Sequence, residues 1–174
     1  TLSFEAGADA VLDEGSTFTR TIVFGDGEDN GEAGWRYAID YGDGMVETGT
    51  TLVRSLELSH LYADGDATHT VTVTLTDGEG ESASDSFTVQ VDNVAPTLPI
   101  SGADSVDEGS AYVLSLGTLA DPGADTVTAY TLDWGDGTVQ TLTAAEFAAL
   151  GGSAGHVYGD DGSYAITLSV TDED

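Results

Sequence analysis

The feature that most constrains the fold is an internal repeat with a period of about 95 residues. Short motifs recur in the same order in both halves of the chain. The matched pairs are Thr1–Phe4 with 97–100, Gly7–Asp9 with 102–104, Asp13–Ser16 with 107–110, Tyr41–Gly44 with 134–137, His60–Tyr62 with 156–158 and Leu75–Asp77 with 170–172. A module of that length suits a β-sandwich of about 100 residues. We therefore predict two domains, 1–93 and 94–174, joined near Asp92–Pro96.

Alternating apolar residues predict strands in both copies. Val71, Val73 and Leu75 share one strand face, and Phe87, Val89 and Val91 share another. The expected strands of copy one are 17–24, 35–41, 45–48, 52–58, 70–76 and 84–91, and those of copy two are 111–116, 126–134, 138–142 and 164–170. No segment of copy two corresponds to 84–91, so we expect it to lack its final strand. The fold class is therefore all-β.

One helical segment is expected in copy two. Thr143 and Glu146 have capping-box spacing, and Gly151 follows the apolar residues after them. We expect one or two helical turns here, in place of the segment around Leu52–Leu58 of copy one.

The charge of the chain limits its partners. Its 174 residues include 32 acidic residues, three arginines and no lysine, for a net charge of −29. Such a surface repels nucleic acid and anionic membranes, and it attracts cations. No stretch is long and apolar enough to span a bilayer. There is no cysteine, so a bound metal is the expected substitute for a disulfide in stabilising a small domain.

Several motifs resemble the PKD (polycystic kidney disease) domain, an immunoglobulin-like β-sandwich of bacterial surface and secreted proteins. Copy two carries the pattern as Glu108-Gly109, Asp121-Pro122, Trp134–Gly137, His156–Tyr158 and Gly162–Asp172. Copy one matches more loosely: Gly25–Gly27 replaces Asp-Pro, and 67–70 lacks the Gly-x-Tyr. The resemblance implies two tandem immunoglobulin-like sandwiches in an extracellular protein.

The resemblance also implies Ca²⁺ sites. In calcium-binding PKD modules the ligands come from the linker, the Asp-Pro loop and the turn after the Thr-Asp motif. The corresponding residues of copy two are Asp92 or Asn93, Asp121, Asp125 and Asp172. Those of copy one are Asp26, Asp29 and Asp77, and its linker ligand would precede Thr1. Glu14 and Glu108 are further candidate ligands at the junctions. The alternative is that these acidic turns are simply solvated.

The sequence offers little support for catalysis. It has no cysteine, no serine in a nucleophile-elbow pattern and no zinc-type histidine pair. We therefore expect a non-catalytic, monomeric spacer or adhesion module whose junction is stiffened by Ca²⁺. Its partners would be neighbouring repeats, a cell-surface or matrix protein, or a polysaccharide. The alternative function is a polysaccharide- or protein-binding appendage of a secreted hydrolase, which would need an exposed aromatic platform. Adhesion between copies through an open edge strand is a third reading.

Overall fold

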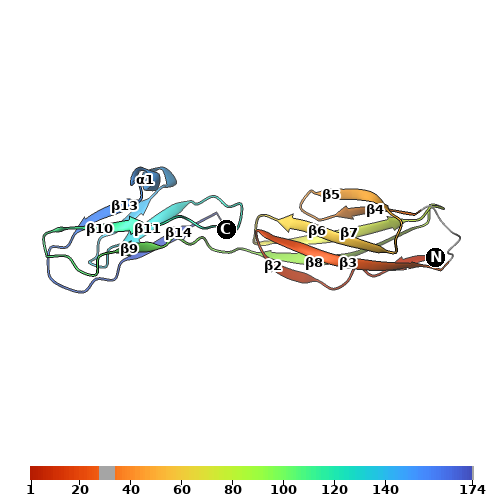
Figure 1. The fold of residues 1–174 in the computed structure, drawn as a ribbon, viewed down its shortest axis with the longest axis horizontal. Helices are drawn as coiled ribbons and strands as arrows, with labels where there is room; N and C mark the ends of the chain where they lie inside the picture. Colours follow the sequence, from red (N-terminus) through yellow and green to blue (C-terminus); the bar gives the residue numbers. More distant parts are fainter. Residues whose placement is uncertain (28–33, 174) are drawn as a thin grey trace. The chain divides into compact units, whose positions relative to one another are not determined.

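The computed structural model describes residues 1–27 and 34–173. The chain divides into two compact units, Thr1–Asn93 (unit 1) and Val94–Asp174 (unit 2). Unit 1 holds strands β1–β8, and unit 2 holds β9–β14 and helix α1 (Figure 1). The described residues contain no helix that is long and apolar enough to cross a membrane.

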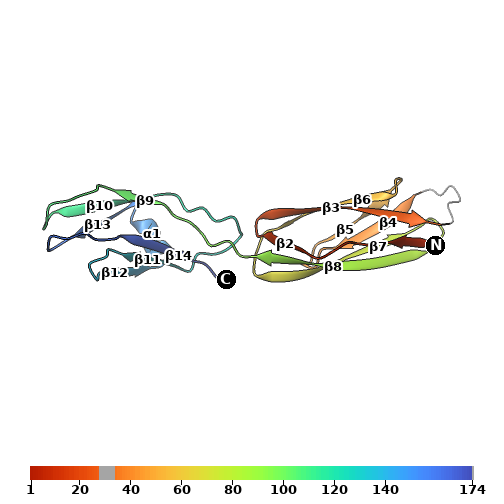
Figure 2. The ribbon, with the colours of Figure 1, turned by 90° about the horizontal axis from the view of Figure 1, so that it is seen from below.

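Unit 1 is a sandwich of two sheets (Figure 2). The first sheet has the order β1 (Leu2–Phe4), β3 (Ser16–Asp26), β6 (Ser55–Tyr62). The second has the order β2 (Ala10–Asp13), β8 (Ser82–Asp92), β7 (Ala67–Thr76), β4 (Trp35–Asp40), β5 (Val46–Thr51). All of these pairs are antiparallel except β2 with β8, which is parallel. Strand β8 therefore lies between β2 and β7.

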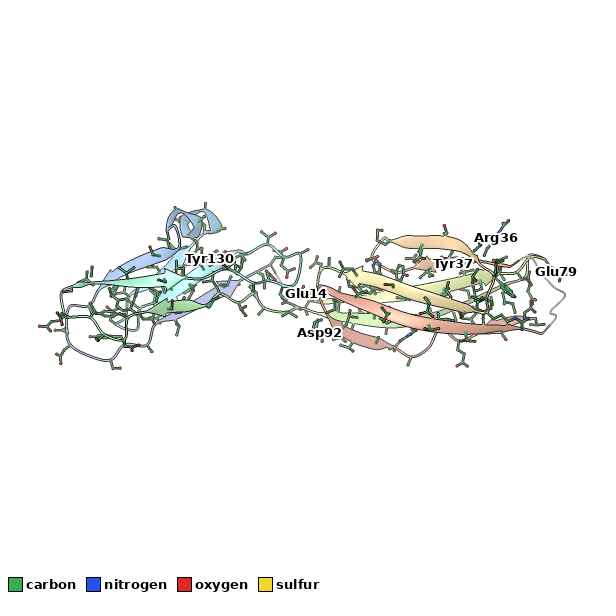
Figure 3. All side chains as sticks on the ribbon, in the orientation of Figure 1. Glu14, Arg36, Tyr37, Glu79, Asp92 and Tyr130 are labelled. Atoms are coloured by element: carbon green, nitrogen blue, oxygen red, sulfur yellow. The ribbon has the colours of Figure 1, made fainter. Side chains whose placement is uncertain are left out.

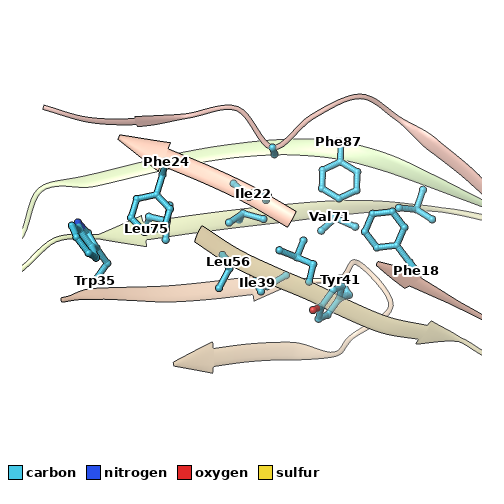
Figure 4. Close-up of a cluster of buried hydrophobic side chains, with 14 of the residues drawn as sticks. Phe18, Ile22, Phe24, Trp35, Ile39, Tyr41, Leu56, Val71, Leu75 and Phe87 are labelled. Carbon is cyan, nitrogen blue, oxygen red and sulfur yellow. The ribbon is translucent and has the colours of Figure 1, made fainter. Parts of the chain in front are cut away.

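Alternate residues of these strands form the core of unit 1 (Figure 4). Ile39, Val71, Val73, Leu75, Val89 and Val91 are fully buried. Phe18, Ile22 and Phe24 of β3 pack against them, together with Leu56 and Leu58 of β6. Because successive strand residues point to opposite faces, the hydroxylic residues between these positions face outward. The period of two seen in the sequence is thus the inside–outside alternation of the sandwich.

Unit 2 has two three-stranded sheets. They have the orders β13 (Ser153–Val157), β10 (Ala111–Leu116), β9 (Ile100–Gly102) and β12 (Val139–Leu142), β11 (Ala129–Asp133), β14 (Thr167–Thr171). Its buried core is Tyr112, Leu114, Leu116, Leu132, Trp134, Ala154 and Tyr158. The prediction of a chain built almost entirely of β-strands is confirmed, and the strands form separate sheets in each of the two units.

Strand β14 is shorter than predicted. The expected strand 164–170 begins only at Thr167. In unit 1, Ala67–Val71, the first half of β7, pairs with β8 and not with β4. The corresponding residues 162–166 have no strand partner among the described residues of unit 2. An extended segment without a neighbour makes no ladder hydrogen bonds, so the strand begins three residues later than predicted.

Helix α1 (Ala144–Ala149) begins with the predicted capping box. The Thr143 hydroxyl accepts from the Glu146 amide, and the Glu146 carboxylate accepts from the Thr143 amide. The expectation that helical turns replace the segment around Leu52–Leu58 is wrong for most of that segment. Strand β13 pairs with β10 as β6 pairs with β3, so the helix takes the place of the short turn at 52–54.

Candidate metal centre

The loop 117–128 of unit 2 carries two of the predicted ligands. It is fixed at its start by two backbone hydrogen bonds between Thr97 and Ala120, each 2.8 Å long. This isolated bridge holds Asp121 beside the first residues of unit 2. A hollow of about 420 Å³ lies here, lined by Val94, Ala95, Thr97, Leu119, Ala120, Asp121 and Pro122. The loop is therefore held against the segment by which the chain enters the unit.

Asp121 and Asp125 come together within this loop. Each offers a carboxylate oxygen, and the two oxygens lie within 4.8 Å of one another. Both side chains are partly buried. Neither carboxylate oxygen of Asp121 accepts a hydrogen bond from the described residues. Unit 2 has no lysine or arginine, so no such side chain of its own can neutralise the pair. Two carboxylates this close favour a bound cation between them.

Asp172 is hydrogen-bonded to the last residue of the same loop, Thr128. The residue follows β14 and is 8% exposed. Its backbone carbonyl accepts from the Thr128 hydroxyl at 2.9 Å, and the Glu173 carboxylate accepts from the Thr126 amide. These bonds tie the chain after β14 to the residues that follow Asp125. The loop 117–128 is thus anchored at both ends.

Glu14 and Asp92 lie at the end of unit 1 at which the chain leaves it (Figure 3), and Asn93 follows Asp92 in the sequence. Glu14 is only 1% exposed, and its amide donates to the Asp92 carbonyl. A Cβ on Gly65 would lie 2.7 Å from Glu14 Oε2 and 2.7 Å from Asn93 Cα. Gly65 therefore lets the Glu14 carboxylate sit directly beside Asn93. Asp92 is partly buried and accepts from Gln90 Nε2 at 2.6 Å.

The remaining predicted ligands have different surroundings. Asp26 is 7% exposed, and its Oδ1 is 3.1 Å from the Thr1 amino group. Asp77 is 6% exposed, and its Oδ1 accepts from the amides of Glu79 and Glu81, closing the β7–β8 turn. Asp29 lies outside the described residues.

Glu108 occupies the place in unit 2 that Glu14 has in unit 1. The next amide, Gly109, donates to the Tyr158 carbonyl, as Gly15 donates to that of Tyr62. Unlike Glu14, Glu108 is exposed. The two glutamates therefore occupy equivalent turns of the two units, but Glu14 is buried and Glu108 is exposed to solvent.

Sequence reasoning did not find a paired histidine–aspartate contact that recurs in both units. His60 Nε2 is 2.6 Å from Asp43 Oδ2, and His156 Nε2 is 2.7 Å from Asp136 Oδ2. Each imidazole also stacks on the aromatic residue of the Gly-Asp-Gly turn, at ring-centroid distances of 4.1 Å for Tyr41 and 4.7 Å for Trp134. The signal was present, because both partners recur together in the repeat. This contact fixes the turn onto the strand that ends in the His-x-Tyr motif.

This contact predicts a dependence of stability on pH. The hydrogen bond with His156, followed by that from the Thr138 amide, lowers the pKa of Asp136 to about 2. A carboxylate whose folded-state pKa is depressed stabilises the fold above its unfolded pKa, near 3.9, and loses that effect as the pH falls toward the folded value. We expect Asp136→Asn to be less stable than the natural chain at pH 7, with a difference that shrinks between about pH 4 and 2. Urea midpoints at several pH values measure it, and a difference that does not vary with pH would contradict it.

Comparison with known proteins assigns part of the chain. Residues 93–174 match the family model of the PKD domain. No curated protein sequence matches the chain. One similar solved structure is described as "structural insight into host cell surface retention of a 1.5-MDa bacterial ice-binding adhesin". It is 14% identical over 99% of this chain and 63% of its own, with a TM-score of 0.34.

A second similar structure is that of Dpr2 Ig1-Ig2 in complex with DIP-Theta Ig1-Ig3. It is 10% identical over 98% of this chain and 65% of its own, with a TM-score of 0.36. This chain thus spans less than two thirds of the length of either structure, and at these TM-scores neither adds to the fold derived from strand pairing. The likeness of unit 1 to the PKD pattern stays a prediction. Residues 93–174, which include all of unit 2, therefore match the PKD domain.

Proposed function

We propose that this chain is a non-catalytic extracellular spacer or adhesion segment, in which one Ca²⁺ ion restrains the two units relative to one another. PKD domains are typically non-catalytic, which agrees with this role. The observation that carries the calcium proposal is the Asp121–Asp125 pair, with carboxylate oxygens within 4.8 Å in a unit that has no lysine or arginine.

The chemistry of the ligands favours Ca²⁺. This ion takes six to eight oxygen ligands from carboxylates, carbonyls and water, in flexible geometry. Asp121 and Asp125 would supply carboxylate oxygens from unit 2, and Asp172 is a further candidate. Nitrogen and sulfur ligands, which zinc prefers, are absent from the loop 117–128. A hard divalent cation therefore suits the site better than a transition metal.

The length of the linker allows unit 1 to contribute ligands. The chain runs from Asn93 to Thr97 in four residues, which span at most about 14 Å. Glu14 lies beside Asn93, and Thr97 is bridged to Ala120, next to Asp121. The linker is therefore short enough to let the buried Glu14 carboxylate and the side chain of Asn93 be brought to an ion held by the loop. An ion shared in this way would limit the motion of the linker.

A thermal melt tests calcium binding. We expect Ca²⁺ at about 100 times its Kd to raise the melting temperature of unit 2 by roughly 10–20 °C over the value in chelator. Ligand at about 100 times its Kd stabilises by about 2.7 kcal/mol, and about 1 kcal/mol shifts a domain of this size by roughly 4–8 °C. Sodium chloride at the same ionic strength is the control. A shift no larger than that caused by sodium chloride would contradict the proposal.

Matched variants locate the ion. Asp121→Asn combined with Asp125→Asn is expected to abolish the calcium-dependent shift. Asp160→Asn combined with Asp161→Asn removes the same charge from exposed positions of unit 2 and is expected to retain it. Equal responses in the two double variants would show that calcium acts only through the overall charge.

The restraint between units needs a separate measurement. The chain has no cysteine, so two introduced cysteines would be the only labelling sites. Leu61 and Val139, 53% and 54% exposed, place one spin label on each unit. We expect Ca²⁺ to narrow the distribution of distances between labels at Leu61→Cys and Val139→Cys. Binding without narrowing would leave a calcium site but overturn the restraining role.

The appendage alternative receives less support. Recognition of polysaccharide by an aromatic platform needs exposed rings. All fourteen tryptophan, tyrosine and phenylalanine residues are described, and each is at least partly buried. Phe147, one of the least buried, stacks on Tyr130 at 3.9 Å between ring centroids. The surface thus lacks the platform that this function would use.

A further inference from the structure

Residues Glu5–Asp9 of unit 1, which we call the strap, cross from one sheet of the sandwich to the other. They follow β1, which pairs with β3, and they precede β2, which pairs with β8. The strap itself belongs to no strand. Ala6 in its middle is nevertheless only 1% exposed. Contacts other than a β-ladder therefore hold the strap against the sandwich.

Two carboxylates join the strap to β8 by a reciprocal pair of hydrogen bonds. The Ala6 amide donates to Asp85 Oδ2 at 2.8 Å, and the Thr88 amide donates to Asp9 Oδ1 at 2.7 Å. Each side of the contact thus supplies one carboxylate and one amide. Side chains here take the place of the main-chain carbonyls that accept hydrogen bonds in a ladder.

Arg20 of β3 holds the strap from the other sheet. Its Nη1 donates to the Ala6 carbonyl at 3.0 Å, and its Nη2 donates to the Ala8 carbonyl at 2.6 Å. The guanidinium carbon lies 3.9 Å from the centroid of the Phe87 ring, which is a cation–π contact. The fixed, planar arrangement of donors on a guanidinium suits two neighbouring carbonyls.

The sandwich itself does not require an arginine at this position. Phe18 and Arg20 occupy the same places in the β3–β6 ladder as Tyr112 and Leu114 in the β10–β13 ladder. Leu114 is 2% exposed and belongs to the core of unit 2. The Tyr112 hydroxyl donates to the Ala103 carbonyl at 3.1 Å. Because a leucine fills this place in unit 2, the charge of Arg20 serves the strap and not the packing of the sheet.

The hydrogen-bond acceptors that join the strap to β8 can be protonated. The hydrogen bond from the Thr88 amide lowers the pKa of Asp9, and the charge of Arg20 adds to this effect. The hydrogen bond from the Ala6 amide lowers the pKa of Asp85. Each carboxylate therefore stabilises the closed strap above its ordinary pKa, near 3.9, and loses that effect as the pH falls toward the lowered value.

Few other charged groups face these two carboxylates. Arg20 is the charged side chain that β3 directs toward Asp9. Asp85 lies opposite Val73 of β7. Strand β1 and the first three residues of β2 carry no titratable side chain, and Glu5, the remaining carboxylate of the strap, is exposed. The titration of the strap is therefore set by Asp9, Asp85 and Arg20.

We propose that the strap is an acid-sensitive switch: protonation of Asp9 and Asp85 opens Glu5–Asp9 locally, while the two sheets of unit 1 stay folded. Opening would separate the Ala6 and Ala8 carbonyls from Arg20 and uncover the ring of Phe87. This ring packs beside Phe18, at 5.5 Å between centroids (Figure 4). Acid would thus expose aromatic surface that unit 1 keeps covered at neutral pH.

Hydrogen exchange in the whole chain tests the proposal. The amides of Ala6 and Thr88 report on the strap. Those of Val73 and Leu75 report on the core, because β7 is paired on both sides at these residues. Protection is the exchange rate of an unstructured peptide divided by that of the chain at the same pH. Between about pH 6 and 3 we expect it to fall about tenfold at the strap, where two hydrogen bonds are weakened, and to change little in the core.

Asparagine variants test the trigger. Asp9→Asn and Asp85→Asn each keep an oxygen acceptor that does not titrate. Either variant is expected to reduce the pH dependence at the strap, and the double variant is expected to remove it. Asp64→Asn, at an exposed position of unit 1 outside the strap, is the control and should retain the full pH dependence.

Arginine variants test the contact from β3. Arg20→Leu introduces the residue that unit 2 has at this place and is expected to lower protection of the strap about tenfold at pH 6, with little change in the core. Arg36→Leu removes the same charge from the exposed face of β4 and should change neither. Arg20→Lys keeps the charge but not the paired donors, so its effect should be smaller and gives a second measurement if the leucine variant does not fold.

Three results would overturn the proposal. Protection that falls equally at the strap and in the core would show that unit 1 opens only as a whole. A pH dependence that survives in the double asparagine variant would exclude Asp9 and Asp85 as the trigger. Equal effects of Arg20→Leu and Arg36→Leu would exclude Arg20 as the residue that holds the strap. All of these measurements concern unit 1 without Ca²⁺, so this proposal and the proposed function fail independently.

Discussion

Replacement of Trp134 by alanine is expected to cost about 3–5 kcal/mol and to leave unit 2 largely unfolded. The indole is fully buried, stacks on His156 and meets Tyr112 edge to face. The cavity left by its loss would open at the centre of a core of seven buried residues. A unit with two three-stranded sheets has little further packing with which to compensate.

The two tryptophans make this result measurable. Trp35 lies in unit 1 and Trp134 in unit 2, so Trp35 alone reports on unit 1 in the Trp134→Ala variant. We expect unchanged emission from Trp35 and a loss of the dispersed amide signals of unit 2. Val139→Ala, at a position 54% exposed, is the control and should change stability by less than about 0.5 kcal/mol. A folded unit 2 in Trp134→Ala would contradict the central role of the indole.

The second large effect is expected at Gly135, in the turn that follows Trp134. Gly135 and Gly137 both have positive φ, 80° and 93°. A Cβ at Gly135 would lie 2.5 Å from the carbonyl oxygen of Ala165, whereas at Gly137 nothing lies within 4 Å. Gly137→Ala should therefore cost only the left-handed backbone, about 1–2 kcal/mol, and Gly135→Ala should add about 1–3 kcal/mol of steric strain.

Unit 1 supplies a second instance of the same comparison. Gly42 has a φ of 82°, and its Cβ would lie 2.7 Å from the Thr70 carbonyl oxygen, whereas Gly44 has open space. Urea denaturation of the four alanine variants measures both pairs. Equal costs at Gly135 and Gly137, or at Gly42 and Gly44, would mean that the chain opposite the first glycine of the turn moves aside readily, and would contradict the expected steric strain.

The sequence predicted the sandwich because its signals are local. Val71, Val73 and Leu75 alternate with threonines, and a strand with one buried face requires that alternation. The capping box at Thr143 likewise acts within four residues. The helix was misplaced relative to copy one because the residues of β10 that pair with β13 are 38 or more positions away in the sequence.

The candidate site was harder to predict because it depends on environment. Asp77 and Asp172 match in the repeat, yet the Asp77 carboxylate is engaged by the amides of Glu79 and Glu81 within its own turn. Glu14 and Glu108 also match, but only Glu14 is buried, beside Gly65. Residue type and spacing indicate which side chains can bind a cation. Burial and prior hydrogen bonds decide which of them are suited to do so, and both depend on residues far away in the chain.

The parallel pairing of β2 with β8 bears on how unit 1 carries tension. A pull along the chain would enter β2 from the side of Ala10 and leave β8 through Asp92, and these lie at opposite ends of the paired ladder. The four paired positions, Ala10 to Asp13, would be loaded together in shear and would not open one at a time. We therefore expect single-molecule stretching to show unit 1 resisting until all four pairs break in one event, and a gradual opening of unit 1 at low force would argue against this assignment of strength.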